Sequence, residues 1–303
     1  MPAIGNTPLI KLERLAEPGC AEIYVKYEGA NPTGSMKDRM ALSMVEGAER
    51  RGQLKPGGKV MDYTGGSTGS SLAMVCATKG YKAYFVSSDA FAEEKLQTMK
   101  AFGAELEIFP SGDRKITAQL IDSMIKRARE LSKEPNVFWT DQFNNIDNRN
   151  GYHNMAKEII SVLGKDIDEF IMGVGTGGCF SGNSEILKKE IPAIRCIAIE
   201  PYHVRALSGG EISGNHKLEG IGAGFVPSIC RLDLADEIVA VKDEDAVDTA
   251  RKLARLEGIF GGTTSGANVW TAVQRARKLG AGKKIVTVVC DSGLKYLNGD
   301  LYK

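Results

Sequence analysis

The sequence has few histidines and lacks the cysteine pairs that metal sites use. Its three histidines, His153, His203 and His216, lie far apart, and its six cysteines are scattered without a C-x-x-C pair. This spacing excludes a zinc knuckle and a disulfide framework, and we therefore expect no metal. A reduced, cytoplasmic setting is the simpler interpretation of unpaired cysteines.

The sequence also lacks an excess of one charge and any long apolar run. Its 39 Lys and Arg residues balance 38 Asp and Glu residues, which gives a net charge of +1. This balance argues against binding to nucleic acid or to an anionic membrane. Because no 18 consecutive residues are apolar, a membrane-spanning helix is excluded, and the first nine residues do not form a signal peptide. The 303 residues, 43% of them hydrophobic, predict a globular chain of two domains or one large domain.

Short apolar segments alternate with segments of helical period along most of the chain. This alternation predicts parallel sheets with helices on both faces, and ligands bind at the carboxyl ends of such strands. An irregular, glycine-rich stretch covers residues 201–227, and a turn-rich segment near residues 141–150 suggests a domain boundary. The predicted strands include residues 59–63, 82–86, 105–109, 169–173, 195–200 and 284–290, and the predicted helices include 70–79, 116–131, 150–163, 243–257 and 265–279.

The most glycine-rich motif is GVGTGG at residues 173–178, between a predicted strand and a predicted helix. Glycines let the backbone approach a ligand, and the start of a helix favours a negative charge, so the motif predicts a phosphate-binding loop. It also reads as G-x-G-x-x-G, with Glu200 at the end of the next predicted strand. An NAD-dependent oxidoreductase is therefore an alternative.

Three further segments carry residue types that suit chemistry. TGGSTG at residues 64–69 precedes a helix and presents hydroxyl groups and bare backbone N–H groups to an anion. Lys37, in NPTGSMKDR at residues 31–39, stands in the first turn of a predicted helix, where the helix dipole favours a neutral amine. GGTTSG at residues 261–266 again places hydroxyl groups before a helix. Each of these segments alone is also compatible with helix capping or a solvated surface.

Taken together and in order, these segments resemble the fold type II pyridoxal-phosphate (PLP) enzymes. Within this group the chain is most similar to the cysteine synthase (O-acetylserine sulfhydrylase) and cystathionine β-synthase family. The resemblance rests on nearly the whole chain: IGNTPL at residues 4–9, the motifs at 31–39, 64–69 and 175–178, Gln142-Phe143, EGIGAGF at 219–225, residues 261–266, and Asp291-Ser-Gly followed by Tyr296-Leu297.

The resemblance implies an α/β fold of two domains, each a mostly parallel twisted sheet flanked by helices, like the β subunit of tryptophan synthase. A smaller, mobile, substrate-side domain is expected over residues 36–145. A larger domain that binds the PLP phosphate is expected over residues 1–35 and 146–303.

The resemblance also implies the roles of individual residues. Lys37 is the expected Schiff-base lysine and the catalytic base. Thr264 is expected to hydrogen-bond the pyridine nitrogen, where a neutral hydroxyl gives a moderate electron sink. The cofactor-binding residues are expected to be Lys37, Ser67, Gly175, Thr176, Gly177, Gly178, Cys179 and Thr264, and the substrate-binding residues Thr64, Gly65, Ser67, Thr68, Gln142 and Gly222.

The sequence departs from its relatives in the substrate loop, at Asp291 and at Cys179, which stands where the family usually has a further threonine. The substrate loop of relatives usually reads T-S-G-N-T-G, whereas here Gly65 replaces the serine and Ser67 replaces the asparagine. Asp291 resembles the cystathionine synthase version of its loop. Ser67 either replaces the asparagine contact to the cofactor at shorter reach, or the two loop changes together widen or reshape the site for another substituent. We favour the second interpretation.

The implied reaction is a PLP-dependent β-replacement on O-acetylserine or a similar β-substituted L-alanine. Sulfide or a thiol would add to an α-aminoacrylate and give L-cysteine or a thioether. A cystathionine β-synthase-like reaction, a cysteine-consuming, sulfide-releasing reaction, a serine or threonine dehydratase and a non-catalytic PLP-binding paralogue are the alternatives. Relatives lead us to expect a cytoplasmic homodimer that binds the tail of a serine acetyltransferase.

Overall fold

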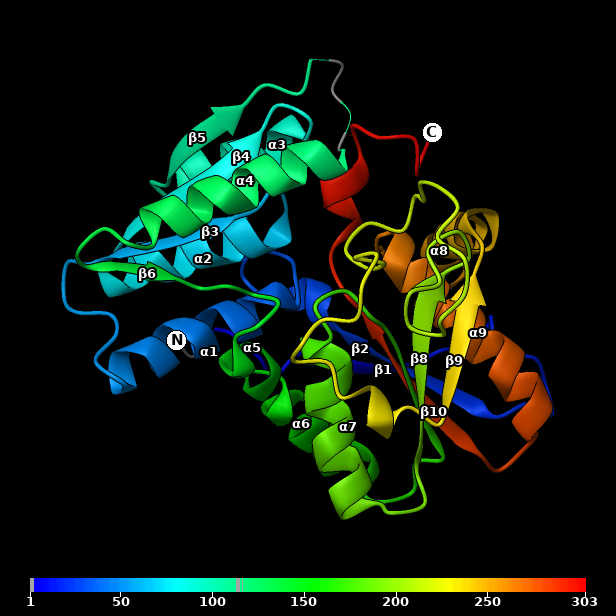
Figure 1. Ribbon diagram of the computed structural model, residues 1–303. Helices are drawn as coiled ribbons and strands as arrows, with labels where there is room; N and C mark the ends of the chain where they lie inside the picture. Colours follow the sequence, from blue (N-terminus) through cyan, green and yellow to red (C-terminus); the bar gives the residue numbers. More distant parts are fainter. Residues whose placement is uncertain (1–2, 113–114, 116) are drawn as a thin grey trace. The chain divides into compact units, whose positions relative to one another are not determined.

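The chain folds into two compact units in the computed structural model, which describes residues 3–112, 115 and 117–303 (Figure 1). The smaller unit is Lys37–Gly151, and the larger unit combines Pro2–Met36 with Tyr152–Lys303. The domain limits expected at residues 36 and 145, and the mobility of the smaller domain, stay predictions. The expected domains and the helix expected at 116–131 also include residues 1, 2, 113, 114 and 116, which lie outside the described residues.

The smaller unit contains a four-stranded parallel sheet in the order β5-β4-β3-β6. Figure 1 shows α4 on one face of this sheet and α2 and α3 on the other. The strands are β3 (Lys59–Tyr63), β4 (Lys82–Ser88), β5 (Glu105–Phe109) and β6 (Val137–Trp139); the helices are α1 (Lys37–Arg50), α2 (Ser67–Lys79), α3 (Glu93–Ala101), α4 (Ala118–Leu131) and α5 (Ile146–Asn150).

The larger unit contains a six-stranded sheet in the order β1-β2-β10-β7-β8-β9, in which only the pair β1–β2 is antiparallel. Its strands are β1 (Leu9–Lys11), β2 (Glu22–Tyr27), β7 (Glu169–Gly173), β8 (Arg195–Pro201), β9 (Glu237–Val241) and β10 (Lys284–Val289). Its helices are α6 (His153–Leu163), α7 (Gly178–Glu190), α8 (Asp243–Glu257) and α9 (Thr263–Leu279), with the 3-10 turns η1 (Glu28–Ala30), η2 (Leu232–Leu234) and η3 (Gly293–Tyr296). The predicted fold class is therefore confirmed.

The central strands of the larger sheet are apolar because both of their faces are covered. All five residues of β7 are buried, as are five of the six residues of β10. Strands covered on both faces read as continuous hydrophobic runs, which is why the sequence predicts them well. Small residues of α9, among them Ala267, Ala272 and Ala276, pack in the same apolar core as β2, β8 and β10.

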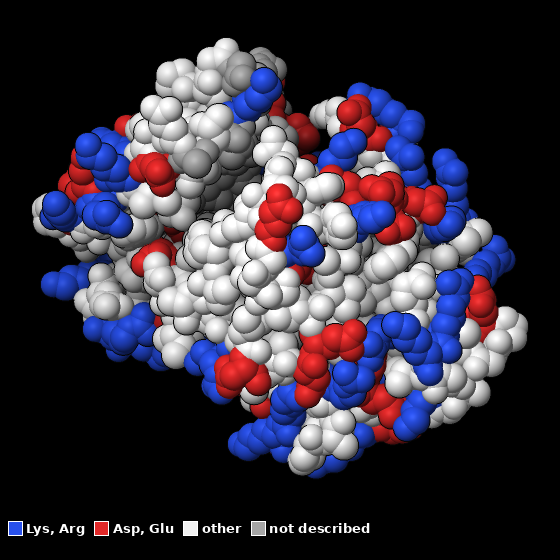
Figure 2. All heavy atoms as spheres, turned by 45° about the vertical axis from the view of Figure 1, so that its right-hand side comes forward, with Lys and Arg blue, Asp and Glu red and all other residues white. Residues whose placement is uncertain are grey.

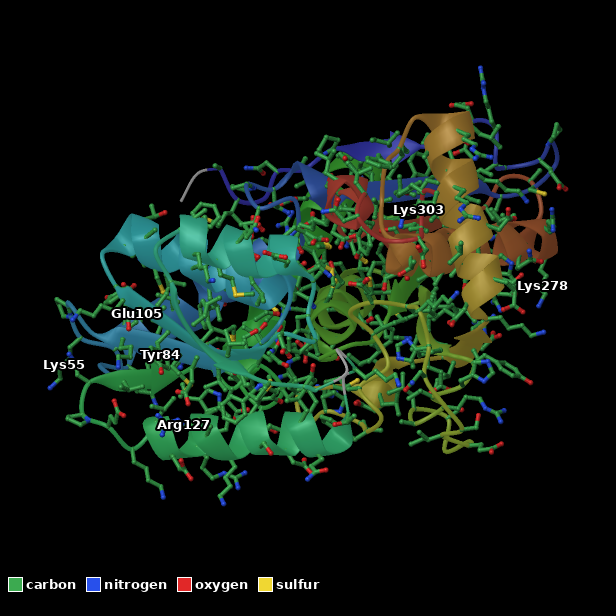
Figure 3. All side chains as sticks on the ribbon, turned by 90° about the horizontal axis from the view of Figure 1, so that it is seen from above. Lys55, Tyr84, Glu105, Arg127, Lys278 and Lys303 are labelled. Carbon is green, nitrogen blue, oxygen red and sulfur yellow. The ribbon has the colours of Figure 1, made fainter. Side chains whose placement is uncertain are left out.

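Polar side chains fix α4 on the smaller sheet. The Tyr84 hydroxyl donates to Glu107 Oε2 at 2.7 Å, and Arg127 Nε donates to Glu107 Oε1 at 2.9 Å. Tyr84 and Arg127 accordingly lie near each other, from β4 and α4, in Figure 3. Figure 2 shows Lys and Arg interspersed with Asp and Glu over the face in view, as the balanced composition predicts.

Two helices differ from the sequence-based prediction. The helix expected over residues 150–163 is wrong at its start, because α5 ends at Asn150 and α6 begins at His153. Gly151, between them, has no room for a side chain, since a Cβ there would lie 2.8 Å from the Arg39 carbonyl oxygen. Helix α2 begins at Ser67, three residues earlier than expected, so Ser67 and Thr68 belong to its first turn.

Candidate active site

The smaller unit brings together two of the residues expected to bind substrate. Residues 64–69 connect β3 to the first turn of α2, and Gln142 follows β6. Thr68 Oγ1 donates to Gln142 Oε1 at 2.9 Å, and both side chains are buried. Asn148 Nδ2 donates to the Gln142 carbonyl at 2.7 Å and fixes its backbone. Because Thr68 occupies the amide oxygen, the Gln142 NH₂ group is the part of this pair that suits a carboxylate.

A buried carboxylate, Asp62, joins the carboxyl ends of β3 and β6 beside this pair. Its Oδ1 accepts from Tyr63 N at 2.8 Å and from Trp139 Nε1 at 3.0 Å, and its Oδ2 accepts from the Thr140 hydroxyl. Burial raises the pKa of Asp62 to about 6, although these hydrogen bonds favour the charged form. Asp62 thus holds the segment that leads to Gln142 against the strand that leads to residues 64–69. The sequence analysis did not identify Asp62 as a site residue. Its position, an aspartate within the otherwise apolar strand predicted at 59–63, could have indicated it.

The space that Gly65 vacates is filled by another side chain. A Cβ atom on Gly65 would lie 1.9 Å from Phe91 Cγ. The ring of Phe91 occupies this space, so Gly65 leaves no opening there. The reshaping of the site for another substituent, which the sequence analysis also allowed, stays a prediction. Phe91 is a second residue that sequence reasoning missed, and its position in the chain, 26 residues further on, gave no signal.

Lys37 is the first residue of α1, as the sequence predicts. The segment before it is tied to the end of β10 in the larger unit: Met36 N donates to the Cys290 carbonyl at 2.9 Å, and Ser35 pairs with Asp291. Lys37 thus directly follows a backbone segment that is hydrogen-bonded to the end of β10.

In the larger unit, residues 174–177 connect β7 to α7 and form a backbone cradle. Gly177 has a φ of 83°, which favours glycine, and it is the N-cap of α7. A Cβ on Gly175 would lie 2.1 Å from the Gly220 carbonyl oxygen. A helix start with bare backbone N–H groups is a site for a phosphate group. These residues fit the phosphate of PLP. Cys179 follows them in the first turn of α7, and its side chain is buried.

Thr264 and Gly222 lie beside this cradle. Gly222 N donates to the Val174 carbonyl at 3.1 Å, and Thr264 Oγ1 donates to the Glu219 carbonyl at 2.6 Å. The larger unit therefore gathers the loop before α7, the loop at 219–222 and the start of α9. The Thr264 proton is directed to a backbone carbonyl here, so its contact with a ring nitrogen stays a prediction.

Asp291 belongs to a hydrogen-bonded cluster at the end of β10. Its Oδ2 accepts from the Tyr296 hydroxyl at 2.6 Å, and its Oδ1 accepts from Gly262 N at 3.3 Å. Burial and the neighbouring Asp291 charge raise the pKa of Tyr296 well above its ordinary value, which keeps its proton in place as a donor. Asp291 thus fixes the backbone two residues before Thr264.

Glu200 does not suit the ribose-binding role that the oxidoreductase alternative requires. This buried carboxylate accepts from Leu207 N at 2.7 Å and from Ser208 Oγ at 2.5 Å. It therefore orders the start of the irregular segment. Within the described part of the chain, no three His, Cys, Asp or Glu residues cluster as metal ligands, and no helix has the length and apolar character needed to cross a membrane.

Comparison with known proteins agrees with this geometry. Residues 1–291 match the family model described as pyridoxal-phosphate dependent enzyme. The chain is 43% identical to a cysteine synthase of Staphylococcus aureus (strain Mu50) over 301 residues, 99% of this chain and 95% of that protein.

Solved structures of similar proteins share the fold. A hydrogen sulfide-producing enzyme from Fusobacterium nucleatum matches with a TM-score of 0.91 and 38% identity, over 98% of this chain and 96% of the other. An O-acetylserine dependent cystathionine β-synthase from Helicobacter pylori matches with a TM-score of 0.91 and 35% identity, over 100% of this chain and 97% of the other.

The chain belongs to the pyridoxal-phosphate dependent enzymes, and within them to the family of the cysteine synthases. It is an enzyme, its cofactor is PLP, and its reaction class is β-replacement, as the sequence predicted. The oxidoreductase alternative is excluded by this membership.

Proposed function

We propose that this enzyme makes L-cysteine from O-acetyl-L-serine, or a similar β-substituted L-alanine, and sulfide. The observation that carries the proposal is the match to a cysteine synthase at 43% identity over 99% of the chain. The buried Thr68–Gln142 pair supports it. The Thr68 hydroxyl binds the amide oxygen of Gln142, which leaves the amide NH₂ group to donate to the α-carboxylate of an amino acid.

The proposal gives the main expected residues the following tasks. When bound, PLP supplies an electron sink for the electron pair of the substrate's α-carbon. Lys37 would hold the cofactor covalently, and its free amine would take the α-proton of the substrate on Nζ. The backbone of residues 175–178, with the Thr176 hydroxyl, binds the phosphate through N–H groups at the start of α7. Thr64, Thr68 and Gln142 would bind the carboxylate of the substrate, and Thr264 would be the hydroxyl that serves the pyridine nitrogen.

A cystathionine β-synthase-like or cysteine-consuming reaction is the second candidate. Its support is the likeness to the H. pylori and F. nucleatum enzymes, whose names state those activities. Sulfide could be the attacking group in one direction and the leaving group in the other, so the same site serves both.

A substrate panel separates these reactions. The purified enzyme is mixed with O-acetylserine, O-phosphoserine, serine or cysteine, each with sulfide or homocysteine, and the products are measured by mass spectrometry. We expect the highest kcat/KM for O-acetylserine with sulfide. A preference for cysteine as the amino acid would favour the second candidate, and no product from any pair would favour a non-catalytic paralogue.

The role of Lys37 has a direct test. We expect Lys37→Ala to abolish turnover and the visible absorbance of the lysine-bound cofactor, because the variant lacks both the tether and the base. Some cofactor should still bind through the backbone cradle. Lys55→Ala, at an exposed lysine of the same unit, is the control and should behave as the parent enzyme. Full turnover of Lys37→Ala would remove Lys37 from the mechanism.

The assembly and location expected from relatives are also part of this proposal. We propose a cytoplasmic homodimer with a mobile smaller domain, which binds the tail of a serine acetyltransferase. Sedimentation of the purified protein tests the dimer, and titration with a peptide of that tail tests the second partner.

A further inference from the structure

A buried carboxylate without a task in the proposed function lies in the segment that leads to Lys37. Glu28, in the 3-10 turn η1 directly after β2, is fully buried. Its Oε1 accepts from the Thr7 hydroxyl at 2.6 Å, and its Oε2 accepts from Asn31 Nδ2 at 2.8 Å. A buried carboxylate is stable only where donors replace its water, so these contacts hold Thr7 and Asn31 to Glu28.

Asn31 connects this carboxylate to the backbone that follows. Its Nδ2 also donates to the Glu28 carbonyl at 3.0 Å, and its Oδ1 accepts from Gly5 N at 2.9 Å. The Asn31 carbonyl accepts from Gly34 N at 2.7 Å in a turn where Gly34 has a φ of 69°, which favours glycine. The Gly34 carbonyl in turn accepts from Ser292 N at 2.9 Å. Hydrogen bonds therefore fix this segment from Glu28 onward.

The segment ends at the sheet edge where the backbone cradle begins. β10 lies between β2 and β7 and is parallel to both, so the carboxyl ends of the three strands share one edge. Met36 N donates to the Cys290 carbonyl after β10, and Gly173 ends β7. Asn268 joins these two strand ends, since its Oδ1 accepts from Gly173 N at 2.9 Å and its Nδ2 donates to the Val288 carbonyl at 2.8 Å. Met36 and the start of the cradle are thus held in one hydrogen-bonded frame.

We propose that Glu28 is a positioning residue for Lys37, because it fixes, through Asn31, the backbone of residues 31–36 from which Lys37 continues. This inference rests on the proposed function, since it deepens the role given there to Lys37. The motif at residues 4–9 then has a task as well: Gly5 N and the Thr7 hydroxyl are the donors that complete the contacts of Asn31 and Glu28.

The physical reason is the flexibility of the lysine side chain. A lysine amine is carried on a long stem with several rotatable bonds, so its position depends on how well the backbone beneath it is fixed. A fixed backbone narrows the space that Nζ samples and raises its effective concentration at a reacting atom. Glu28 exchanges no proton and forms no bond in the reaction, so its effect is on the covalent attachment of PLP and on the rate of proton transfer.

The role of Glu28 is tested by PLP titration of the apoprotein, with and without Lys37. We expect Glu28→Ala to weaken PLP binding by about 10-fold where Lys37 is present, because the covalent tether forms less readily. In the Lys37→Ala background, where the backbone cradle alone binds PLP, Glu28→Ala should change the affinity less than about 2-fold. An equal loss in both backgrounds would show that Glu28 supports the cradle and would overturn the assignment.

Two variants control for a general loss of stability. Glu28→Gln keeps an oxygen for Asn31 and offers an NH₂ group to the Thr7 hydroxyl, so PLP binding should stay within about 2-fold of the parent enzyme. Lys26→Met removes another buried polar group of β2, whose Nζ donates to the Thr7 carbonyl and pairs with Glu158 at 2.7 Å. It should lower the Tm as Glu28→Ala does and leave PLP binding unchanged. A loss of PLP binding as large as that of Glu28→Ala would count against Glu28. If Glu28→Ala does not fold, Asn31→Ser replaces it in the same titrations.

A second readout follows Lys37 as the base. On the holoenzyme with O-acetylserine and sulfide, Glu28→Ala should lower kcat by about 10- to 100-fold and change KM less than about 2-fold. The reason is that Thr68 and Gln142, proposed to bind the substrate, belong to the smaller unit. Deuterium at the α-carbon should slow the variant more than the parent enzyme, because proton transfer to Nζ becomes the slower step. A raised KM with unchanged kcat would overturn the assignment.

The outcomes separate this inference from the proposed function. If the parent enzyme performs no β-replacement but the two titrations differ as expected, the proposed function fails and the assignment of Glu28 holds. If Lys37→Ala keeps the visible absorbance of the lysine-bound cofactor, the role of Lys37 and the assignment of Glu28 fail together.

Discussion

The phosphate loop (residues 173–178) and the substrate loop (residues 64–69) differ in what surrounds their glycines. In the larger unit, a Cβ on Gly175 would lie 2.1 Å from the Gly220 carbonyl oxygen, and Gly177 has a φ of 83°. In the smaller unit, a Cβ on Gly65 would meet the Phe91 ring, and one on Gly69 would lie 2.5 Å from Met99 Sδ. In the first loop a backbone oxygen stands at the Cβ position of Gly175 and a left-handed φ constrains Gly177, where the Cys230 side chain is also close, whereas in the second loop the nearest atoms to both glycines belong to side chains.

This difference shows which loop can change. A carbonyl oxygen or a left-handed φ cannot be exchanged by a second substitution, so the phosphate loop requires glycine in any relative with this backbone. A side chain can be exchanged, so each glycine of the substrate loop can become another residue if its neighbour shrinks. Specificity for the substrate can therefore vary while cofactor binding stays constant.

The largest effect is expected at Gly175, where a backbone oxygen stands next to the position of a Cβ atom. Gly175→Ala should lower the free energy of unfolding by about 3 kcal/mol and weaken PLP binding by about 100-fold or more, because the Gly220 carbonyl cannot move without breaking the loop. Chemical denaturation and PLP titration of the apoprotein measure both effects.

Gly66→Ala is the control, since its Cβ meets open space, and it should cost less than about 1 kcal/mol. If Gly175→Ala bound PLP as the parent enzyme does, the backbone of this loop would be adaptable, and the distinction between the two loops would be lost.

The sequence predicts the features that repeat or that depend on local chemistry. The strands at 59–63, 105–109 and 169–173 and the helix at 243–257 agree with the structure residue for residue. Lys37 at a helix start and the glycine cradle after β7 were also predictable, because both are local arrangements of strand, turn and helix.

Features that depend on distant neighbours were not predictable. β1 and β6 have three residues each, too few for a periodic pattern, and they exist because a neighbouring strand pairs with them. Phe91 acts on Gly65 across a strand and a helix, and the hydrogen-bond donors to Asp62 come from residues 139 and 140. A single sequence carries no sign of such contacts.

A smaller effect is expected from the buried carboxylate beside the substrate loop. Burial raises the pKa of Asp62 from 3.8 to about 6 in the folded protein. The protonated form is thus favoured by folding, so this stabilising contribution is fully present below about pH 4 and is lost as the pH rises through 6. The shift of about two units corresponds to about 3 kcal/mol at most.

Asp62→Asn should remove this pH dependence. The difference in unfolding free energy between the parent enzyme and the variant should change between pH 4 and 7 and stay constant above pH 7, as urea denaturation would show. If the difference in unfolding free energy did not vary with pH, Asp62 would be ionised in the folded protein over this whole pH range. Its hydrogen-bond donors would then offset the effect of burial on its pKa.

The smallest effect concerns the hydrogen bond between Thr68 and Gln142. Thr68→Val removes the donor to Gln142 Oε1, a contact of 2.9 Å between buried groups, and should raise the KM for the amino acid about 5-fold with little change in kcat. A cycle with Gln142→Met should give a coupling of about 1 kcal/mol.

In the phosphate loop, Thr176 Oγ1 accepts from Gly178 N at 3.4 Å, a long contact. Thr176→Val should therefore weaken PLP binding less than about 3-fold, because backbone N–H groups remain. A larger loss than for Thr68→Val would show that side chains hold the phosphate as well, and that the two loops are built alike.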